Sequence, residues 1–207
     1  MIKELEGDGS FFQDDPVLKK YFFDRKPTKS EKEKIDKLYS IVNNFCKKVY
    51  NEEVSYLDIG YLDDFGYYEL TYADRGWYDL TELGEDVNKV SLHAIDEILF
   101  SNGFDYELQN RKILEQEFDT RFKEFNFEPL GGLESNRRFN ILHVTEYILS
   151  KWEKYYDGNI KEDTIKRYED YINSIWWTKE QNITWEYDRD SKKINCKKVK
   201  DKEKVKR

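Results

Sequence analysis

Apolar and polar residues alternate in three short segments near the middle of the chain. The segments are residues 55–61, 67–73 and 77–83. Alternation of this kind predicts antiparallel strands with one buried face. Residues 63–66 (DDFG) and 74–76 (DRG) separate the segments and supply the Asp and Gly that tight turns favour. The pattern therefore predicts a three-stranded meander.

A stripe of apolar residues at helical spacing precedes the strands. These residues recur three and four positions apart from Ile35 to Val49, which predicts a helix of about five turns. Ser30 and Glu33 fit a capping box, with Ser30 at the N-cap and Glu33 at the third helical position. Cys46 lies on the apolar stripe, so we interpret it as a small core residue rather than a nucleophile.

Helical spacing returns after the strands. Ser91 is predicted to cap a short helix, and a longer helix is predicted from Asn102-Gly103 to about residue 125. The residues of the longer helix that we expect to point inward are Phe104, Leu108, Phe118, Phe122 and Phe125. Residues 129–132 (PLGG) end this helix and form the best candidate boundary in the chain.

The C-terminal part repeats the alternation of helix and strand patterns. Residues 135–152 carry a wide apolar face, which predicts a largely buried helix. Residues 165–176 carry a narrower stripe and predict an amphipathic helix. Residues 183–188 and 193–198 predict a hairpin, which either joins the main sheet or stands apart from it.

Together these elements predict an α+β fold, in which a small antiparallel sheet packs against several α-helices. At 207 residues the chain is long enough for one good core or two small ones. We predict an α+β domain at residues 1–130, containing an N-terminal arm, a helix, the meander and two helices. Residues 131–200 are predicted to form a helical extension with the hairpin, packed on the first part, and residues 201–207 a basic tail.

Charge is spread unevenly along the chain. Residues 51–100 contain thirteen acidic and two basic residues, a net charge of −11. The whole chain carries −8, while residues 192–207 contain nine basic and two acidic residues. An acidic body repels nucleic acid and anionic membranes and favours a cationic partner. We therefore expect a protein partner, and neither nucleic acid nor a membrane; the sequence does not fix the oligomeric state.

Aromatic and acidic side chains gather on one predicted face of the meander. If Leu57, Leu70 and Leu80 point inward, the opposite face combines aromatic anchors with carboxylates. The predicted partner-binding residues of this face and its turns are Tyr56, Asp58, Asp63, Asp64, Tyr67, Glu69, Asp74, Trp77 and Asp79. Aromatic residues supply binding energy at interfaces, and charge supplies association rate and specificity. The alternative is that helices within residues 135–176 cover this face, and the sequence favours neither.

Motifs for catalysis or metal binding do not emerge from the sequence. Cys46 and Cys196 belong to no CxxC pair, and no serine lies in a nucleophile elbow. We interpret His93 and His143 as structural, and the adjacent Asp63 and Asp64 as a turn rather than a calcium loop. We therefore predict a non-enzyme with no metal and no cofactor. A carboxylate-based hydrolase or a small-ligand-binding protein is the alternative, because 43 acidic residues do not exclude one.

The N-terminal residues and the distribution of apolar residues bear on location. Residues 1–10 have neither the basic region nor the apolar region of a signal peptide. Apolar runs stay far below the ~18 residues that a membrane span needs. We expect a soluble cytoplasmic protein.

Four runs within residues 51–128 carry a resemblance to a known family. They read DDFGYYELTYADRG, VSLHAIDEILF, FDYELQNR and QEFDTRFKEF, and the strongest part is the DYEL of residues 105–108 with Arg111. The stretch resembles the immunity protein 63 family of bacterial polymorphic toxin systems. Members share a short strand pair around an aromatic motif, an RG turn, a helix, and a DYEL-x-x-R run leading into a long helix.

The resemblance implies a small cytoplasmic protein that binds a cognate toxin and neutralises it. It implies no catalytic residues. In the DYEL run, Asp105 is predicted to cap the long helix and Glu107 to pair with Arg111 at i,i+4. The acidic body suits a cationic toxin, such as a nuclease whose active site attracts phosphate.

Overall fold

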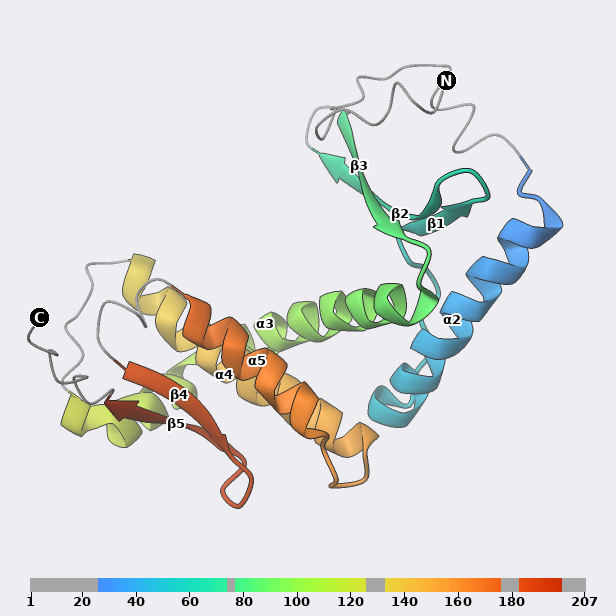
Figure 1. The fold of residues 1–207 in the computed structure, drawn as a ribbon. Coiled ribbons are helices and arrows are strands. Elements are labelled where there is room, and N and C mark those ends of the chain that lie inside the picture. Colours follow the sequence, from blue (N-terminus) through green and yellow to red (C-terminus); the bar gives the residue numbers. More distant parts are fainter. Residues whose placement is uncertain (1–25, 74–76, 126–132, 176–182, 199–207) are drawn as a thin grey trace, which may run out of the picture. The chain divides into compact units, whose positions relative to one another are not determined.

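The computed structural model describes residues 26–73, 77–125, 133–175 and 183–198, without the side chains of residues 70–80 and 133–140. The chain forms two compact units, Met1–Asp96 and Glu97–Arg207. The first unit contains a helix and a three-stranded sheet, and the second contains helices and a two-stranded hairpin (Figure 1). Among the helices of the described residues, none has the length and apolar character that crossing a membrane requires.

Helix α2 (Lys29–Tyr50) confirms the first predicted helix. It ends at Asn51, whose left-handed backbone (φ 61°) allows its N–H to bond the Lys47 carbonyl at 3.0 Å. The apolar stripe is buried, namely Leu38, Val42, Phe45, Cys46 and Val49. Cys46 is 3% exposed, so it is a core residue as predicted.

The three-stranded meander is confirmed. Strands β1 (Ile59–Leu62), β2 (Gly66–Ala73) and β3 (Trp77–Gly84) pair antiparallel in the order β1-β2-β3. The first strand begins at Ile59 rather than at residue 55. The reason is that the Leu57 N–H is bonded to the Tyr39 hydroxyl of α2, at 2.8 Å, instead of joining a strand.

One helix, α3 (Val87–Phe122), takes the place of the two helices predicted on either side of Gly103. The chain stays helical through Gly103, so the predicted break is wrong. The prediction that Ser91 is the N-cap is also wrong. Ser91 is buried in the helix and donates to a carbonyl four residues back, while the Asp86 side chain accepts from the Asn88 N–H at 3.0 Å.

The buried side of α3 changes along the helix. In its first turns the buried residues are Val87, Val90, Ser91, Ala94 and Ile95. Further on they are Leu99, Gly103 and Glu107. At 3.6 residues per turn the buried side therefore rotates around the helix, from the side of Val90 to the side of Gly103 and Glu107. The prediction that Phe104 and Leu108 point inward is therefore wrong, since they are 42% and 58% exposed, whereas Phe122 is buried as expected.

The glycine at position 103 allows close packing of two helices and does not break the helix. A Cβ atom at this position would lie 2.9 Å from Val144 Cγ1 and 3.3 Å from Tyr147 Cδ1 of the following helix. The first distance is too short for a Cβ contact and the second is tight, so glycine permits α3 to approach that helix closely. The cost of a glycine inside a helix, about 1 kcal/mol, is offset by this contact.

The second unit contains the end of α3, a 3₁₀ turn (Lys123–Phe125), α4 (Leu133–Tyr155) and α5 (Glu162–Ser174). Helix α5 returns along α4, and the hairpin of β4 (Ile183–Asp188) and β5 (Lys193–Lys198) packs against both (Figure 1). The hairpin forms a two-stranded sheet of its own. Its core residues are Ile183, Trp185 and Ile194, which pack with the apolar sides of the helices.

The predicted α+β class is confirmed. Both helices predicted for the C-terminal part are present, and α4 is largely buried from Leu142 to Trp152, as its wide apolar face indicated. The predicted boundary at residue 130 falls on residues outside the described ones and stays a prediction.

Candidate functional site

A groove of about 410 Å³ lies between α2 and β1 in the first unit. We call it the α2–β1 groove. One wall is formed by Pro27, Glu31, Lys32, Ile35, Asp36 and Tyr39, and the other by residues 56–62 with Tyr68. Two of the predicted partner-binding residues, Tyr56 and Asp58, belong to it. The groove therefore joins part of the predicted surface to residues of a helix that the sequence did not associate with it.

A capping box fixes the N-terminus of α2. The Thr28 side chain accepts from the Glu31 N–H at 3.1 Å, and the Glu31 carboxylate accepts from the Thr28 N–H at 2.8 Å. The prediction of Ser30 and Glu33 for these roles is wrong by two residues. Tertiary contacts favour the earlier start, because Glu31 is only 3% exposed and also accepts from the Asp63 N–H, at 3.2 Å.

Asp63 is exposed, but its carboxylate is engaged within the unit. Asp63 accepts from the Ser30 hydroxyl at 2.8 Å and from the Thr28 hydroxyl at 3.1 Å. An acidic group near a helix N-terminus is also stabilised by the helix dipole. We therefore assign Asp63 to positioning α2 against the β1–β2 turn. Asp64 follows in the same turn and is exposed.

Tyr67 does not lie on an exposed face. Its side chain is 0% exposed, its hydroxyl donates to the Lys34 carbonyl at 3.0 Å, and its ring meets Tyr61 edge-on at 4.7 Å. The prediction that Tyr67 contacts a partner is therefore wrong. The physical reason is that α2 covers this position, and a tyrosine there buries a large ring while its hydroxyl finds a backbone acceptor.

Tyr56 and Asp58 form the exposed lip of the groove. Tyr56 is 69% exposed. Its hydrogen bond with Asp58 raises the pKa of the Tyr56 hydroxyl above its ordinary value, with burial adding in the same direction. An exposed aromatic ring beside a carboxylate can pack on the stem of a basic side chain while the carboxylate meets its charge.

The Glu69 side chain contacts the neighbouring helix α3. Its carboxylate lies 3.0 Å from His93 Nε2 of α3, and both side chains are partly exposed. This pair connects β2 to the first turns of α3 within the first unit. The structural role predicted for His93 agrees with this contact.

The remaining predicted residues lie where the structure gives no side-chain detail. Asp74 is outside the described residues, and the side chains of Trp77 and Asp79 are outside them as well. Their part in a binding surface stays a prediction.

Three tyrosines of the groove were not singled out from the sequence. Tyr39 lies on the apolar stripe of α2, where its hydroxyl accepts from Leu57, and Tyr61 packs on Tyr67. Tyr68 faces Gly60 across the β1–β2 pair, and a Cβ atom at Gly60 would lie 2.2 Å from the Tyr68 hydroxyl. The glycine in an otherwise regular strand was the one available signal, since it marks a close approach.

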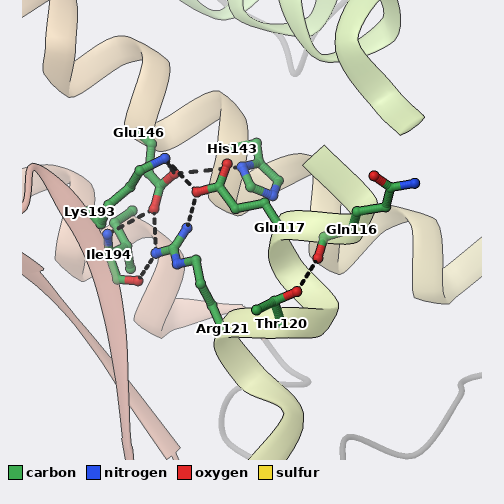
Figure 2. A network of polar contacts seen from close by, with 8 residues as sticks. All are labelled: Gln116, Glu117, Thr120, Arg121, His143, Glu146, Lys193 and Ile194. Atoms are coloured by element: carbon green, nitrogen blue, oxygen red, sulfur yellow. Dashed lines mark hydrogen bonds and ion pairs between the residues drawn. The ribbon is translucent and has the colours of Figure 1, made fainter. Parts of the chain in front are cut away.

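A second set of polar side chains is buried in the other unit (Figure 2). Glu146 of α4 accepts from Arg121 Nη2 at 2.8 Å and from the Ile194 N–H at 2.9 Å, and it lies 3.5 Å from His143 Nδ1. Lys193 Nζ lies 2.7 Å from Glu117 and 3.4 Å from Glu146. We call these residues the Glu146 network; it connects α3, α4 and β5.

The electrostatics of the Glu146 network indicate a structural role. Burial alone raises the pKa of Glu146, but the hydrogen bonds from His143, Arg121 and Ile194 with the charge of Arg121 lower it to about 2. The carboxylate thus stays ionised at neutral pH. His143 is 2% exposed, which agrees with its predicted structural role.

The described residues give little support for a metal site or for a reactive cysteine. No group of three or more His, Cys, Asp or Glu there is arranged to hold a metal ion. Burial raises the pKa of the Cys196 thiol to about 12 and also raises that of Cys46. A thiol with a raised pKa is a poor nucleophile at neutral pH.

The described contacts of the DYEL run indicate structural roles for its residues. Arg111 donates from Nε to Glu107 Oε1 at 2.7 Å and from Nη2 to Glu107 Oε2 at 2.9 Å, so the predicted pair is confirmed. Glu107 is 0% exposed. Asp105 lies in the middle of α3, so the prediction that it caps a helix is wrong.

Comparison with known proteins gives no relative for this arrangement. No family model, no curated protein and no solved structure matches the chain. The resemblance to the immunity protein 63 family therefore stays a prediction.

Proposed function

We propose that this protein is an immunity protein that binds a cognate bacterial toxin domain and neutralises it, without catalytic turnover. The partner is a cationic domain, and a nuclease with a basic active site is the class that fits best. The α2–β1 groove is the observation that carries the proposal. It combines a hollow, aromatic walls and the carboxylates of Glu31, Asp36 and Asp58, and the wall that contains Asp58 belongs to the acidic stretch of residues 51–100.

Charge supports a cationic partner. Residues 51–100, which contain β1, carry a net charge of −11, and the chain carries −8. A surface of this sign raises the association rate of a basic protein and disfavours nucleic acid. A nuclease that attracts phosphate exposes basic groups around its active site, so an acidic protein bound there excludes the substrate.

Aromatic residues support a specific interface rather than general attraction. Tyr39, Tyr56, Tyr61 and Tyr68 all line the α2–β1 groove. Tyrosines concentrate binding energy because a rigid ring buries a large area and its hydroxyl can still form a hydrogen bond. Tyr56 is exposed and available for this role.

The first experiment tests neutralisation in cells. In polymorphic toxin systems the gene directly upstream encodes the toxin, so the C-terminal domain of that product is expressed with and without this protein. We expect loss of viability with the domain alone, and survival with co-purification of the two proteins when both are present. Absence of both survival and co-purification contradicts the proposal.

A matched pair of charge reversals then locates the surface. We expect Asp58→Lys to weaken binding about 10- to 100-fold, the range of an interface hot spot. Glu85→Lys changes the charge equally at an exposed position outside the groove and should weaken binding by less than about threefold. Equal effects of the two substitutions would mean that net charge, and not the groove, determines binding.

The hydrolase alternative has less support. The buried carboxyl group of Glu146 has a lowered pKa, about 2, whereas a general acid at neutral pH needs a raised one. Its Oε1 accepts from Arg121 and from the Ile194 N–H, and its Oε2 lies 3.4 Å from Lys193 Nζ. A small-ligand-binding role of the α2–β1 groove stays open to test by ligand screening if the toxin domain fails to bind.

A further inference from the structure

Strand β1 is an edge strand whose outer side faces the α2–β1 groove. Among the described strands, β1 pairs with β2 alone. All four residues of β1 line the groove, together with the three residues before it, and α2 forms the opposite wall. An edge strand presents backbone N–H and C=O groups that can pair with an added strand.

Side chains of α2 cover the two ends of this outer edge. The Leu57 N–H donates to the Tyr39 hydroxyl at 2.8 Å, and the Asp63 N–H donates to the Glu31 carboxylate at 3.2 Å. In an extended chain, backbone groups two residues apart point the same way. Ile59 and Tyr61 lie between these two ends at that spacing, so their backbone groups are directed toward the groove.

The size of the groove suits a short extended segment. Strand β1 has four residues, which at about 3.3 Å per residue span ~13 Å. The volume of about 410 Å³ corresponds to a few residues rather than to a helix about 10 Å wide. Ile35 and Tyr39 of α2 give the opposite wall an apolar and aromatic surface.

The charge of the groove favours a basic side chain on the segment that binds there. Asp36 and Asp58 line the groove and are exposed, while Glu31 is engaged at the helix N-terminus. Lys32 is the one basic residue among the lining residues. A lysine or arginine of the segment can place its charge near Asp58 and its stem on the Tyr56 ring.

We propose that an extended segment of the partner adds to β1 as a further strand within the α2–β1 groove, with a lysine or arginine beside Asp58. This proposal rests on the proposed function, because it specifies how the cationic toxin domain is bound. Backbone pairing with Ile59 and Tyr61 gives affinity, and the acidic lip gives specificity.

A second copy of this chain is a poorer occupant of the same edge. Each copy carries a net charge of −8, and its most acidic stretch, residues 51–100, includes β1. Pairing two such edges places like charges together, which is unfavourable at an interface. The cationic segment is therefore the occupant that the charge supports.

Amide hydrogen exchange, followed by NMR on the full chain, tests the strand addition. The first probe is the upstream toxin domain in an inactive form. We expect the Ile59 and Tyr61 amides to exchange at least about tenfold more slowly in the complex, and the Leu57 and Asp63 amides to change less because they are already bonded. Binding without added protection at Ile59 and Tyr61 overturns the strand addition and leaves the proposed function standing.

A second probe separates the two proposals when the toxin domain does not bind. The peptide acetyl-Thr-Val-Lys-Val-Thr-amide is titrated to millimolar concentration, with a control in which its Lys is replaced by Glu. Shifts of the Ile59 and Tyr61 amide signals with the Lys peptide alone support the groove proposal even if the toxin proposal fails. Failure of the toxin domain to bind, together with failure of the peptide to shift these amide signals, overturns both proposals.

A photoreactive amino acid in place of Tyr56 identifies the occupant directly. We expect mass spectrometry to find the crosslink on an extended segment of the toxin domain with a basic residue nearby. A crosslink to a second copy, or to another part of the same chain, overturns the proposal. The Asp58→Asn variant should reduce the crosslink yield at least about threefold, and the Glu85→Gln control should not.

Discussion

The Glu31 carboxylate accepts a hydrogen bond from the Asp63 N–H, with 3.2 Å between Oε1 and N. The same carboxylate closes the capping box with Thr28. Asp63 in turn accepts from the hydroxyl groups of Thr28 and Ser30. The start of α2 and the β1–β2 turn therefore hold each other, and they define one end of the α2–β1 groove.

Replacing Glu31 should weaken the first unit more than replacing Glu33. Glu31→Ala removes the capping interaction and the bond to Asp63, so we expect a loss of about 1–3 kcal/mol in the free energy of unfolding. Glu33 forms only an exposed pair with Lys29, at 3.7 Å, among its described contacts, and Glu33→Ala should cost less than about 0.5 kcal/mol. Urea unfolding measures both, and equal losses would contradict the assigned capping box.

The Glu146 network should make stability fall in acid. Because the folded pKa of Glu146, about 2, is below the ordinary value of 4.5, its stabilisation is present above about pH 4.5. It is lost as the pH falls from there toward 2, and the loss between pH 7 and pH 3 is about 2 kcal/mol. Urea unfolding at several pH values measures the slope.

The Glu146→Gln variant is the control for that slope. It lacks the titrating group, so its stability should fall by about 2 kcal/mol less than that of the wild type over the same pH range. Other carboxyl groups contribute equally to both proteins and cancel in the difference. Parallel pH profiles would mean that Glu146 is not held ionised by Arg121 and its neighbours.

The two thiols should react slowly in the folded protein. Burial raises the pKa of Cys196 to about 12, so its thiolate fraction at pH 8 is about a thousandfold smaller than in the unfolded chain. Cys46 is buried in the core and its pKa is raised as well. Alkylation by iodoacetamide at pH 8, with and without denaturant, measures the ratio. Fast alkylation of Cys196 in the folded protein would contradict this assignment.

Gly103→Ala should destabilise the second unit although alanine favours helices. The added Cβ atom meets Val144 Cγ1 at 2.9 Å, so α3 and α4 must move apart or the side chain must shift. We expect a net cost of about 1–3 kcal/mol by thermal or urea unfolding. Ser101→Ala, at an exposed position of the same helix, should change stability by less than about 0.5 kcal/mol. A stabilising Gly103→Ala would show that the close approach is not required.

Local patterns in the sequence predicted most of the elements. The alternation in residues 55–83 specified the meander, and the stripe from Ile35 to Val49 specified α2. The pairing of Glu107 with Arg111 also followed from spacing alone. Each of these depends on neighbours within one element, and such information is present in a single sequence.

Predictions from the sequence were wrong where contacts with a distant element determine the local structure. Both Thr28-x-x-Glu31 and Ser30-x-x-Glu33 fit a capping box, and the contact of Glu31 with Asp63 selects the first. Gly103 fits a helix stop by its residue type, but the position of α4 gives this glycine a packing role. Contacts of this kind depend on tertiary packing, which propensity and spacing do not describe.

The binding surface was only partly predictable for the same reason. Tyr67 and Tyr68 are chemically alike, and only the position of α2 over Tyr67 determines which of them is buried. Tyr56 and Asp58, two of the predicted partner-binding residues, line the groove, but its opposite wall comes from a helix that precedes the strands by a loop. A groove built from two elements cannot be recognised from the periodicity of either one.

The most direct test of an acidic aromatic binding groove is the affinity of the upstream toxin domain for three proteins. They are the wild type, Asp58→Lys and Glu85→Lys. Calorimetry at two salt concentrations gives the three dissociation constants. We expect tight binding by the wild type that weakens at higher salt, a loss of about 10- to 100-fold for Asp58→Lys, and little change for Glu85→Lys. Undiminished binding by a folded Asp58→Lys protein would contradict the groove as the binding site.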